Sequence, residues 1–235
     1  MIIKIDDIEV TVRKKPIKNM HLYVQPPNGQ VEISVPDSVS NDAIKLFIRS
    51  NLGWVKRKKK EFENQPRQTK RQYISGETMY VLGCQYFLEV IENDTKKQSL
   101  TLEGRKAILL VKKDATIKTK EKIVQEWYRS ILRKEIERVL PKWEKITNLK
   151  CTSWQIKKMN TKWGSCNPET KKLWFNLQLA KKTLPCLDYV ILHELIHLKE
   201  PHHNKKFIAL MDLYMPTWHE IRDDLNMQIL DSWGL

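Results

Sequence analysis

Apolar and polar residues alternate along the first 35 positions of the chain, in short runs that turn residues separate. Alternation with a period of two is typical of strands with one buried face. The runs are Ile3–Ile5, Ile8–Val12, Leu22–Val24 and Val31–Val35. With Pro26-Pro27-Asn28-Gly29 as a turn before the last run, the pattern predicts a β-meander.

The apolar spacing becomes helical after Pro36. Ser38 and Ser40 offer N-caps, and apolar residues then recur every three or four positions up to the basic run Lys56–Lys60. These apolar positions are Ala43, Ile44, Phe47, Ile48, Leu52, Trp54 and Val55. The pattern predicts one amphipathic helix with a basic end.

A second group of alternating runs precedes a long helical pattern. The expected strands are Thr78–Leu82, Tyr86–Ile91, Ser99–Leu102 and Ala107–Val111. From about Lys118 to Asn148 the period is 3.6, and Pro141 either kinks or divides this helix. We therefore place a boundary between a β-rich N-terminal half, residues 1–114, and a second half, residues 115–235.

The second half is predicted to be mostly helical, with a small sheet. Trp154–Met159 and Lys172–Asn176 are the expected strands, on either side of a turn at Trp163-Gly164-Ser165-Cys166-Asn167-Pro168. Three helices are expected after it, from about Pro185, at Asn204–Tyr214 and at Pro216–Leu230. The fold class is α+β: a β-rich half with one helix, then a helical half whose small sheet packs on the helix that begins near Pro185.

Composition favours a globular protein in a reducing compartment. Hydrophobic residues make up 41% of the 235 positions and charged residues 30%, which excludes disorder and a membrane bundle. The four cysteines lie far apart, and none forms a Cys-x-x-Cys pair. Acidic residues stand where a signal peptide would be apolar, and Asp188 interrupts the longest apolar run. We expect neither export nor a membrane span.

Basic residues are concentrated in one part of the chain. The formal net charge is +14, yet the last fifty residues hold four basic and eight acidic side chains. The segment Lys56–Arg71 contains the densest basic run. One interpretation is a solvated surface, which such runs usually are. The other is that Lys56–Arg71 binds nucleic acid through its phosphates.

Five of the six histidines fall in the last 43 residues. His193-Glu194-Leu195-Ile196-His197 matches H-E-x-x-H between apolar flanks. Residues four apart share one helix face, so both imidazoles can bind one metal ion, with Glu194 leaning toward the same side. The alternative is a metal-free structural helix. Burying these polar side chains without a partner would be costly, which favours a bound Zn²⁺ ion.

A catalytic zinc site usually has a third protein ligand. His203 is the first candidate, because Pro201 disfavours a helical conformation at Glu200 and lets the chain turn back. The adjacent His202 and the later Glu220 are rival ligands. If zinc is bound, a water molecule on the ion would attack a carbonyl carbon while Glu194 acts as general base. An amide bond would then be cleaved.

The combined motifs resemble one family. These motifs are Thr161-Lys162-Trp163-Gly164-Ser165-Cys166, Leu173-Trp174-Phe175-Asn176-Leu177 and Leu187-Asp188-Tyr189-Val190 before His193–Leu198, then His203 and Phe207. Together they look like the YgjP-like metallopeptidases, relatives of the SprT-like zincins. The resemblance implies a zincin-like, cytoplasmic zinc peptidase with His193, His197 and His203 as ligands and Glu194 as base. The chain departs from the family at Lys162 and His202, where Arg and Asn are common.

Several alternatives stay open from the sequence. Trp163-Gly164-Ser165-Cys166 either places a strand edge beside the metal for substrate pairing, or Trp163 fills core and Gly164 permits a tight turn. Cys166 is a less favoured ligand. Zinc-dependent hydrolysis of a peptide or protein substrate is the leading function. A nucleic-acid-associated protein with a structural zinc site and a metal amidase acting on something other than protein are the alternatives.

Overall fold

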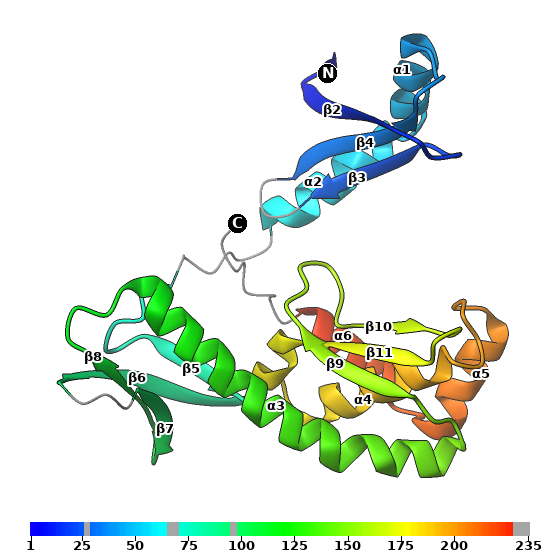
Figure 1. Ribbon diagram of the computed structural model, residues 1–235. Helices are drawn as coiled ribbons and strands as arrows, with labels where there is room; N and C mark the ends of the chain where they lie inside the picture. Colours follow the sequence, from blue (N-terminus) through cyan, green and yellow to red (C-terminus); the bar gives the residue numbers. More distant parts are fainter. Residues whose placement is uncertain (26–28, 65–70, 95–97, 228–235) are drawn as a thin grey trace. The chain divides into compact units, whose positions relative to one another are not determined.

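The computed structural model describes residues 1–25, 29–64, 71–94 and 98–227. It has the α+β architecture that the periodicities predict (Figure 1). The chain forms two compact units, Met1–Thr69 and Lys70–Trp233. Within the described residues, no helix combines the length and the hydrophobicity that crossing a membrane requires.

The first unit contains a mixed sheet. Its strands are β1 (Ile2–Ile5), β2 (Ile8–Lys15), β3 (His21–Gln25) and β4 (Gln30–Pro36). The four predicted strands form, but the predicted meander is wrong: the order is β1-β2-β4-β3, and β2 pairs with β4 in parallel. Burial explains this order. β4 carries the buried side chains of Val31, Ile33 and Val35 and takes a central place, whereas the side chains of β3 alternate between half-buried and exposed at the edge.

Two consecutive helices follow, where one was expected. They are α1 (Asn41–Ser50) and α2 (Leu52–Asn64). Ser40 caps α1 as predicted, since its hydroxyl accepts from the Ala43 amide. Asn51 ends α1, because its backbone amide bonds to Ile48 and its side-chain amide donates to the Phe47 carbonyl.

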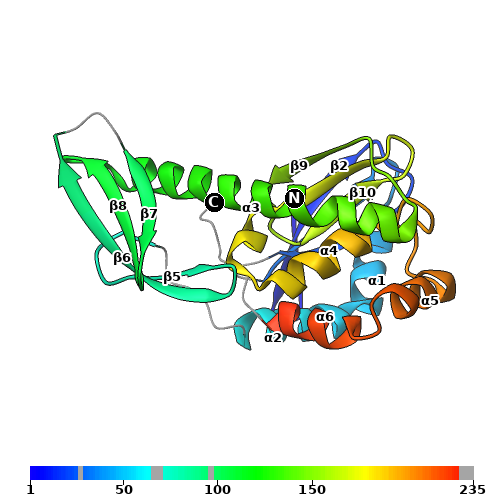
Figure 2. The ribbon, with the colours of Figure 1, turned by 90° about the horizontal axis from the view of Figure 1, so that it is seen from below.

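The second unit begins with another sheet of the same connectivity. Its strands are β5 (Thr78–Val81), β6 (Cys84–Asn93), β7 (Ser99–Glu103) and β8 (Lys106–Lys112), in the order β5-β6-β8-β7 with β6 and β8 parallel. The long helix α3 (Ile117–Thr147) follows and runs through Pro141 without ending. Figure 2 shows α3 extending from this sheet to the rest of the unit. The Tyr128 hydroxyl on α3 donates to the Tyr80 carbonyl on β5.

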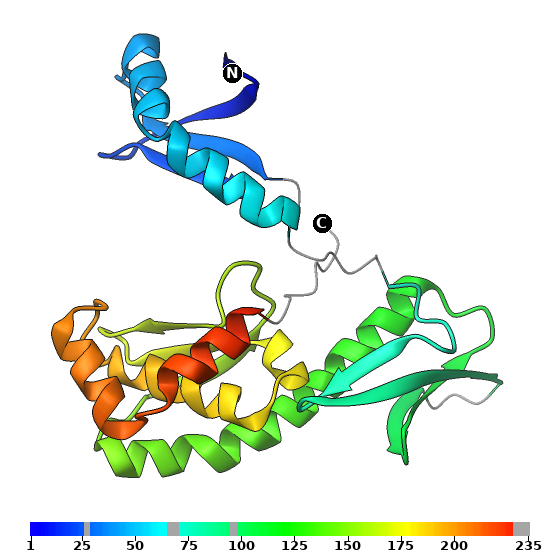
Figure 3. The same cartoon turned by 180° about the vertical axis from the view of Figure 1, so that it is seen from behind.

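A three-stranded sheet, a 3₁₀ turn and three α-helices complete the described part of the second unit. The strands are β9 (Ser153–Lys157), β10 (Gly164–Asn167) and β11 (Lys172–Asn176). The 3₁₀ turn is η1 (Leu177–Lys181), and the α-helices are α4 (Leu184–Ile196), α5 (Lys205–Tyr214) and α6 (Trp218–Met227). The turn predicted at Trp163–Pro168 is wrong, because Gly164–Asn167 is a strand antiparallel to β11. As expected, this sheet packs on α4 (Figure 3).

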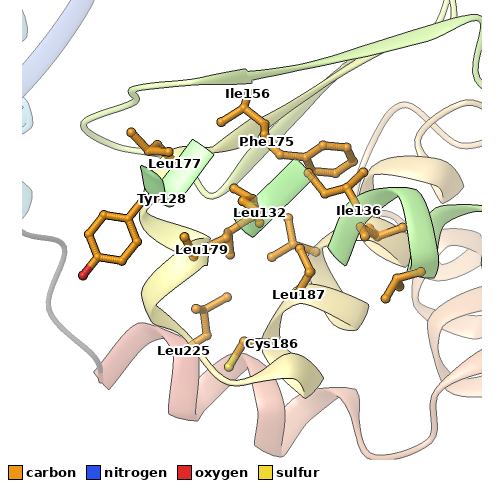
Figure 4. Close-up of a cluster of buried hydrophobic side chains, with 14 of the residues drawn as sticks. Tyr128, Leu132, Ile136, Ile156, Phe175, Leu177, Leu179, Cys186, Leu187 and Leu225 are labelled. Atoms are coloured by element: carbon orange, nitrogen blue, oxygen red, sulfur yellow. The ribbon is translucent and has the colours of Figure 1, made fainter. Parts of the chain in front are cut away.

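The helix α4 is buried on almost every side. Its apolar residues pack with side chains from α3, β9, β11, η1 and α6 (Figure 4). Its Asp188 accepts a hydrogen bond from the Trp143 indole of α3 at 2.8 Å, which explains the polar residue inside the apolar run. Because it is surrounded in this way, α4 is a rigid support for the side chains that it carries.

The compact units divide near residue 69. The reason is packing: strands β5 to β8 share one core with α3, α4 and η1. The backbone amide of Leu82 donates to the Ala180 carbonyl, and that of Gly83 to the Lys181 carbonyl. The division of roles between 1–114 and 115–235 stays a prediction.

Candidate active site

Three imidazoles converge at the end of α4. His193 lies in its last turn, His197 follows as its C-cap, and His203 comes back from the loop before α5. The Nε2 atom of His193 is 3.1 Å from that of His197 and 3.0 Å from that of His203. One nitrogen from each ring lies within 4.8 Å of the others. The structure thus brings together the three histidines that the sequence predicted.

The loop that returns His203 is held by hydrogen bonds. The backbone amide of Glu200 donates to the Ile196 carbonyl, which ends the helical turn before Pro201. Asn204 caps α5 through its bond from the Phe207 amide and also donates to the Glu200 carboxylate. The buried Phe207 ring then lies within 4.9 Å of all three imidazole rings, centre to centre.

The electrostatics of the cluster suit a cation. The Nδ1 atom of His197 is 3.0 Å from the Glu200 carbonyl, so Nδ1 carries the hydrogen and Nε2 presents a lone pair. Burial and the neighbouring His197 and His203 lower the pKa of His193 to about 3, and burial also lowers the pKa of His197. Ring nitrogens from three imidazoles this close together fit a shared metal ion.

Glu194 is buried beside this cluster. The residue is 5% exposed, and its Oε2 atom has no hydrogen-bond partner among the described residues. Burial raises the pKa of Glu194 to about 8, although the charge of Lys162 acts in the opposite direction. A buried carboxyl with a pKa near neutrality suits proton transfer.

A cleft of about 510 Å³ opens onto these groups. The three histidines and Glu194 line it together with residues 162–166. The rival ligands His202 and Glu220 are exposed, and neither belongs to the cluster of described ligand atoms. Cys166 lines the cleft outside that cluster, and burial, with the nearby Glu194, raises the pKa of its thiol to about 12.

The model of one protein family matches residues 18–228, described as the YgjP-like metallopeptidase domain. The chain belongs to the YgjP-like metallopeptidase family. This confirms the resemblance drawn from the Trp-Gly-Ser-Cys and H-E-x-x-H motifs. Membership also makes a metal-dependent peptidase the general class of the protein.

Two solved structures are similar to parts of this YgjP-like chain. One is the metallopeptidase zymogen jannalysin of Methanocaldococcus jannaschii, with 26% identity, 41% of this chain and 91% of that chain covered, and a TM-score of 0.38. The other is the metallopeptidase zymogen abylysin of Pyrococcus abyssi, with 18% identity and a TM-score of 0.36. That match covers 38% of this chain and 90% of the abylysin chain. Comparison with the curated proteins gives no match.

The YgjP-like cleft contains two side chains that sequence reasoning left without a role. Tyr189 lines the cleft, with its ring centre 5.6 Å from that of His193 and its ring parallel to that of Trp218. Burial raises the pKa of Tyr189 to about 12, so its hydroxyl stays protonated. Arg222 of α6 is the second of these two side chains, and it also lines the cleft. Tyr189 had a signal, since it stands four residues before His193 on the same helix face.

The basic segment Lys56–Arg71 lies partly outside the described residues. Within the described part, Lys56 pairs with Asp6 at 3.7 Å. Arg71 donates to the Thr78 carbonyl at 2.7 Å and lies 3.6 Å from Glu77. Arg71 therefore stabilises the second unit of this YgjP-like protein. Nucleic-acid binding by the segment stays a prediction.

Proposed function

We propose that this protein is a zinc-dependent peptidase in which His193, His197 and His203 hold the metal and Glu194 is the general base. One observation carries the proposal. Three imidazole nitrogens converge at a cleft of about 510 Å³, and a buried carboxyl lines the same cleft. A zinc ion bound there would supply a Lewis acid for the scissile carbonyl and lower the pKa of water to about 7.

Three protein ligands favour a catalytic over a structural site. A closed structural zinc site has four protein ligands. Among the described residues, the cluster of ligand atoms contains three, and no further His, Cys, Asp or Glu joins it. The cleft leaves room for substrate and water at the remaining position. This geometry does not favour the alternative of a nucleic-acid-associated protein with structural zinc.

Glu194 is suited to move protons during hydrolysis. Its carboxyl takes a proton from the attacking water and then delivers it to the leaving nitrogen. The burial that raises its pKa makes it a stronger base than an exposed glutamate. Lys162 on the cleft wall keeps that pKa from rising further.

The strand β10 offers a binding surface for a peptide. In the order β10-β11-β9 it is an edge strand, and among the described strands only β11 pairs with it. Its residues Gly164, Ser165 and Cys166 line the cleft. An extended substrate can pair its backbone with such an edge, which favours a peptide over a small non-protein amide.

The ligand set is tested by zinc content and the reaction by peptide cleavage. We expect about one zinc per chain in wild type and in His202→Ala, and loss of zinc in His203→Ala, because among the described residues His203 completes the cluster and His202 lies outside it. We expect Glu194→Gln to keep its zinc and to cleave unstructured peptides about 10³-fold more slowly. Elemental analysis and mass spectrometry of peptide digests measure the two effects.

His202→Ala is the matched control, since it removes an adjacent imidazole that lies outside the cluster. Equal zinc content in the two alanine variants would contradict the ligand set. Cleavage by Glu194→Gln at the wild-type rate would remove Glu194 from its role.

A further inference from the structure

The glycine of the Trp163-Gly164-Ser165-Cys166 motif is not explained by backbone conformation. The positive-φ glycines of the described chain are Gly29, Gly76, Gly83 and Gly104. Gly164 instead has the conformation of a strand, as the first residue of β10. The expectation that Gly164 permits a tight turn is therefore wrong. Another physical property of glycine must account for its position.

The property that matters is size. A methyl group on the Gly164 Cα atom would lie 2.5 Å from Oε1, 2.7 Å from Cγ and 2.8 Å from Cδ of Glu194. Atoms of folded proteins do not approach so closely without one of them moving. The side chain of Glu194 therefore occupies the space that any other residue at position 164 would fill.

The strand cannot easily retreat from Glu194. Gly164 and its three successors pair with β11. The fully buried Asn176 donates from its side chain to the carbonyls of Lys162 at 2.7 Å and Met159 at 2.8 Å. Its backbone amide donates to the Trp163 carbonyl at 2.8 Å. These bonds hold the residues before Gly164 against the sheet.

The backbone of Glu194 cannot retreat either, because α4 is buried among α3, the sheet and α6. What can move is the Glu194 side chain. We propose that Gly164 is a positioning residue, whose missing side chain lets the Glu194 carboxyl lie against β10 at the cleft. The contact itself does not depend on the proposed function, whereas its effect on catalysis rests on Glu194 acting as base.

The contact is tested by a double-mutant cycle on the metal-free protein, with wild type, Gly164→Ala, Glu194→Ala and the double variant. We expect Gly164→Ala to lower Tm by about 5 °C when Glu194 is present, as overpacking of a buried site does. Glu194→Ala removes the three atoms that the methyl group meets. The same glycine substitution should then cost little, a coupling that adjacent residues show.

An equal loss of Tm in both backgrounds would overturn the proposal. If Gly164→Ala alone fails to fold, folding of the double variant supports the contact, and failure of the double variant overturns it. Gly53→Ala is the control, because a methyl group there meets nothing within 4 Å. None of these measurements requires a substrate or a metal.

The catalytic consequence is measured separately on the zinc-loaded protein. We expect Gly164→Ala to bind zinc within threefold of the wild-type affinity and to lose about 100-fold in kcat with little change in KM, because a displaced base slows the chemical step. A rise in KM at constant kcat would overturn the positioning role. If wild type cleaves no peptide, the proposed function fails while the Tm coupling still decides whether Gly164 positions Glu194.

Discussion

At the scale of single residues, two ionisable groups in the cleft have pKa values far from their ordinary ones. Glu194 has a pKa raised to about 8, and His193 has one lowered to about 3, both chiefly by burial. Each group is therefore neutral in the metal-free fold near pH 7, where an exposed glutamate would be ionised. Burial keeps His193 available as a ligand, whereas Glu194 must lose its proton before it can act as a base, and a cation bound beside it would favour that loss.

Burial of Glu194 gives a predicted pH dependence of stability. Between pH 4.5 and 8 the folded, metal-free chain keeps a proton that the unfolded chain loses, so this group's contribution to stability falls as pH rises. Glu194→Gln cannot ionise. We expect its stability relative to wild type to improve by about 4 kcal/mol between pH 5 and pH 9. Urea unfolding in the presence of a chelator measures this difference.

The shift of His193 is common to both proteins and cancels in the comparison. A relative stability of Glu194→Gln that does not change between pH 5 and pH 9 would show that the carboxyl has an ordinary pKa in the folded chain.

At the scale of elements, the β5–β6 turn is attached to the segment that leads into α4. Gly83 in this turn has φ +85°, and its amide donates to the Lys181 carbonyl of η1. A methyl group at Gly83 would lie 2.6 Å from the Cγ2 atom of Thr183, the N-cap residue of α4. The first sheet of this unit thereby supports the start of the helix that carries His193.

Gly83→Ala should destabilise the protein more than Gly76→Ala. Both glycines have positive φ, at +85° and +93°, so both substitutions strain the backbone. Only Gly83→Ala adds a steric clash, with Thr183, since a methyl group at Gly76 meets nothing within 4 Å. We expect the difference to be about 2 kcal/mol in the free energy of unfolding, measured by urea denaturation. Equal losses would mean that Thr183 moves aside freely.

At the scale of the whole molecule, the buried apolar residues that the structure describes form two separate cores. One contains apolar residues between positions 3 and 55, and the other contains residues between positions 73 and 225. No buried residue belongs to both clusters in the described part of the chain. The candidate ligands, Glu194 and Gly164 all belong to the second compact unit.

A chain of residues 70–235 should therefore fold and bind zinc without residues 1–69. We expect a single cooperative unfolding transition and a zinc affinity within about threefold of the full chain, because the three histidines and their supporting contacts are all retained. Circular dichroism and metal titration measure these properties. An unfolded fragment, or one that binds zinc more than tenfold more weakly, would show that the first unit supports the site.

The sequence by itself indicated most of the elements and the residues that gather at the candidate site. Local periodicity predicted the strands of both four-stranded sheets and the helix α3, because the pattern of burial along one element involves neighbours two to four residues apart. The same locality placed His193, Glu194 and His197 on one helix, and Pro201 indicated the return of His203. The motifs together were specific enough to indicate the family.

Tertiary structure alone decided how these parts meet. The parallel pairing of β2 with β4, the strand at Gly164–Asn167 and the exclusion of His202 depend on contacts between residues distant in the chain. Periodicity does not encode such contacts, because strand order depends on which strands share a core, and the place of His202 outside the histidine cluster depends on how the loop before α5 returns. Gly164 is the clearest case. The side chain that a methyl group at this position would meet belongs to Glu194, thirty residues later in the chain, and only packing brings the two residues together.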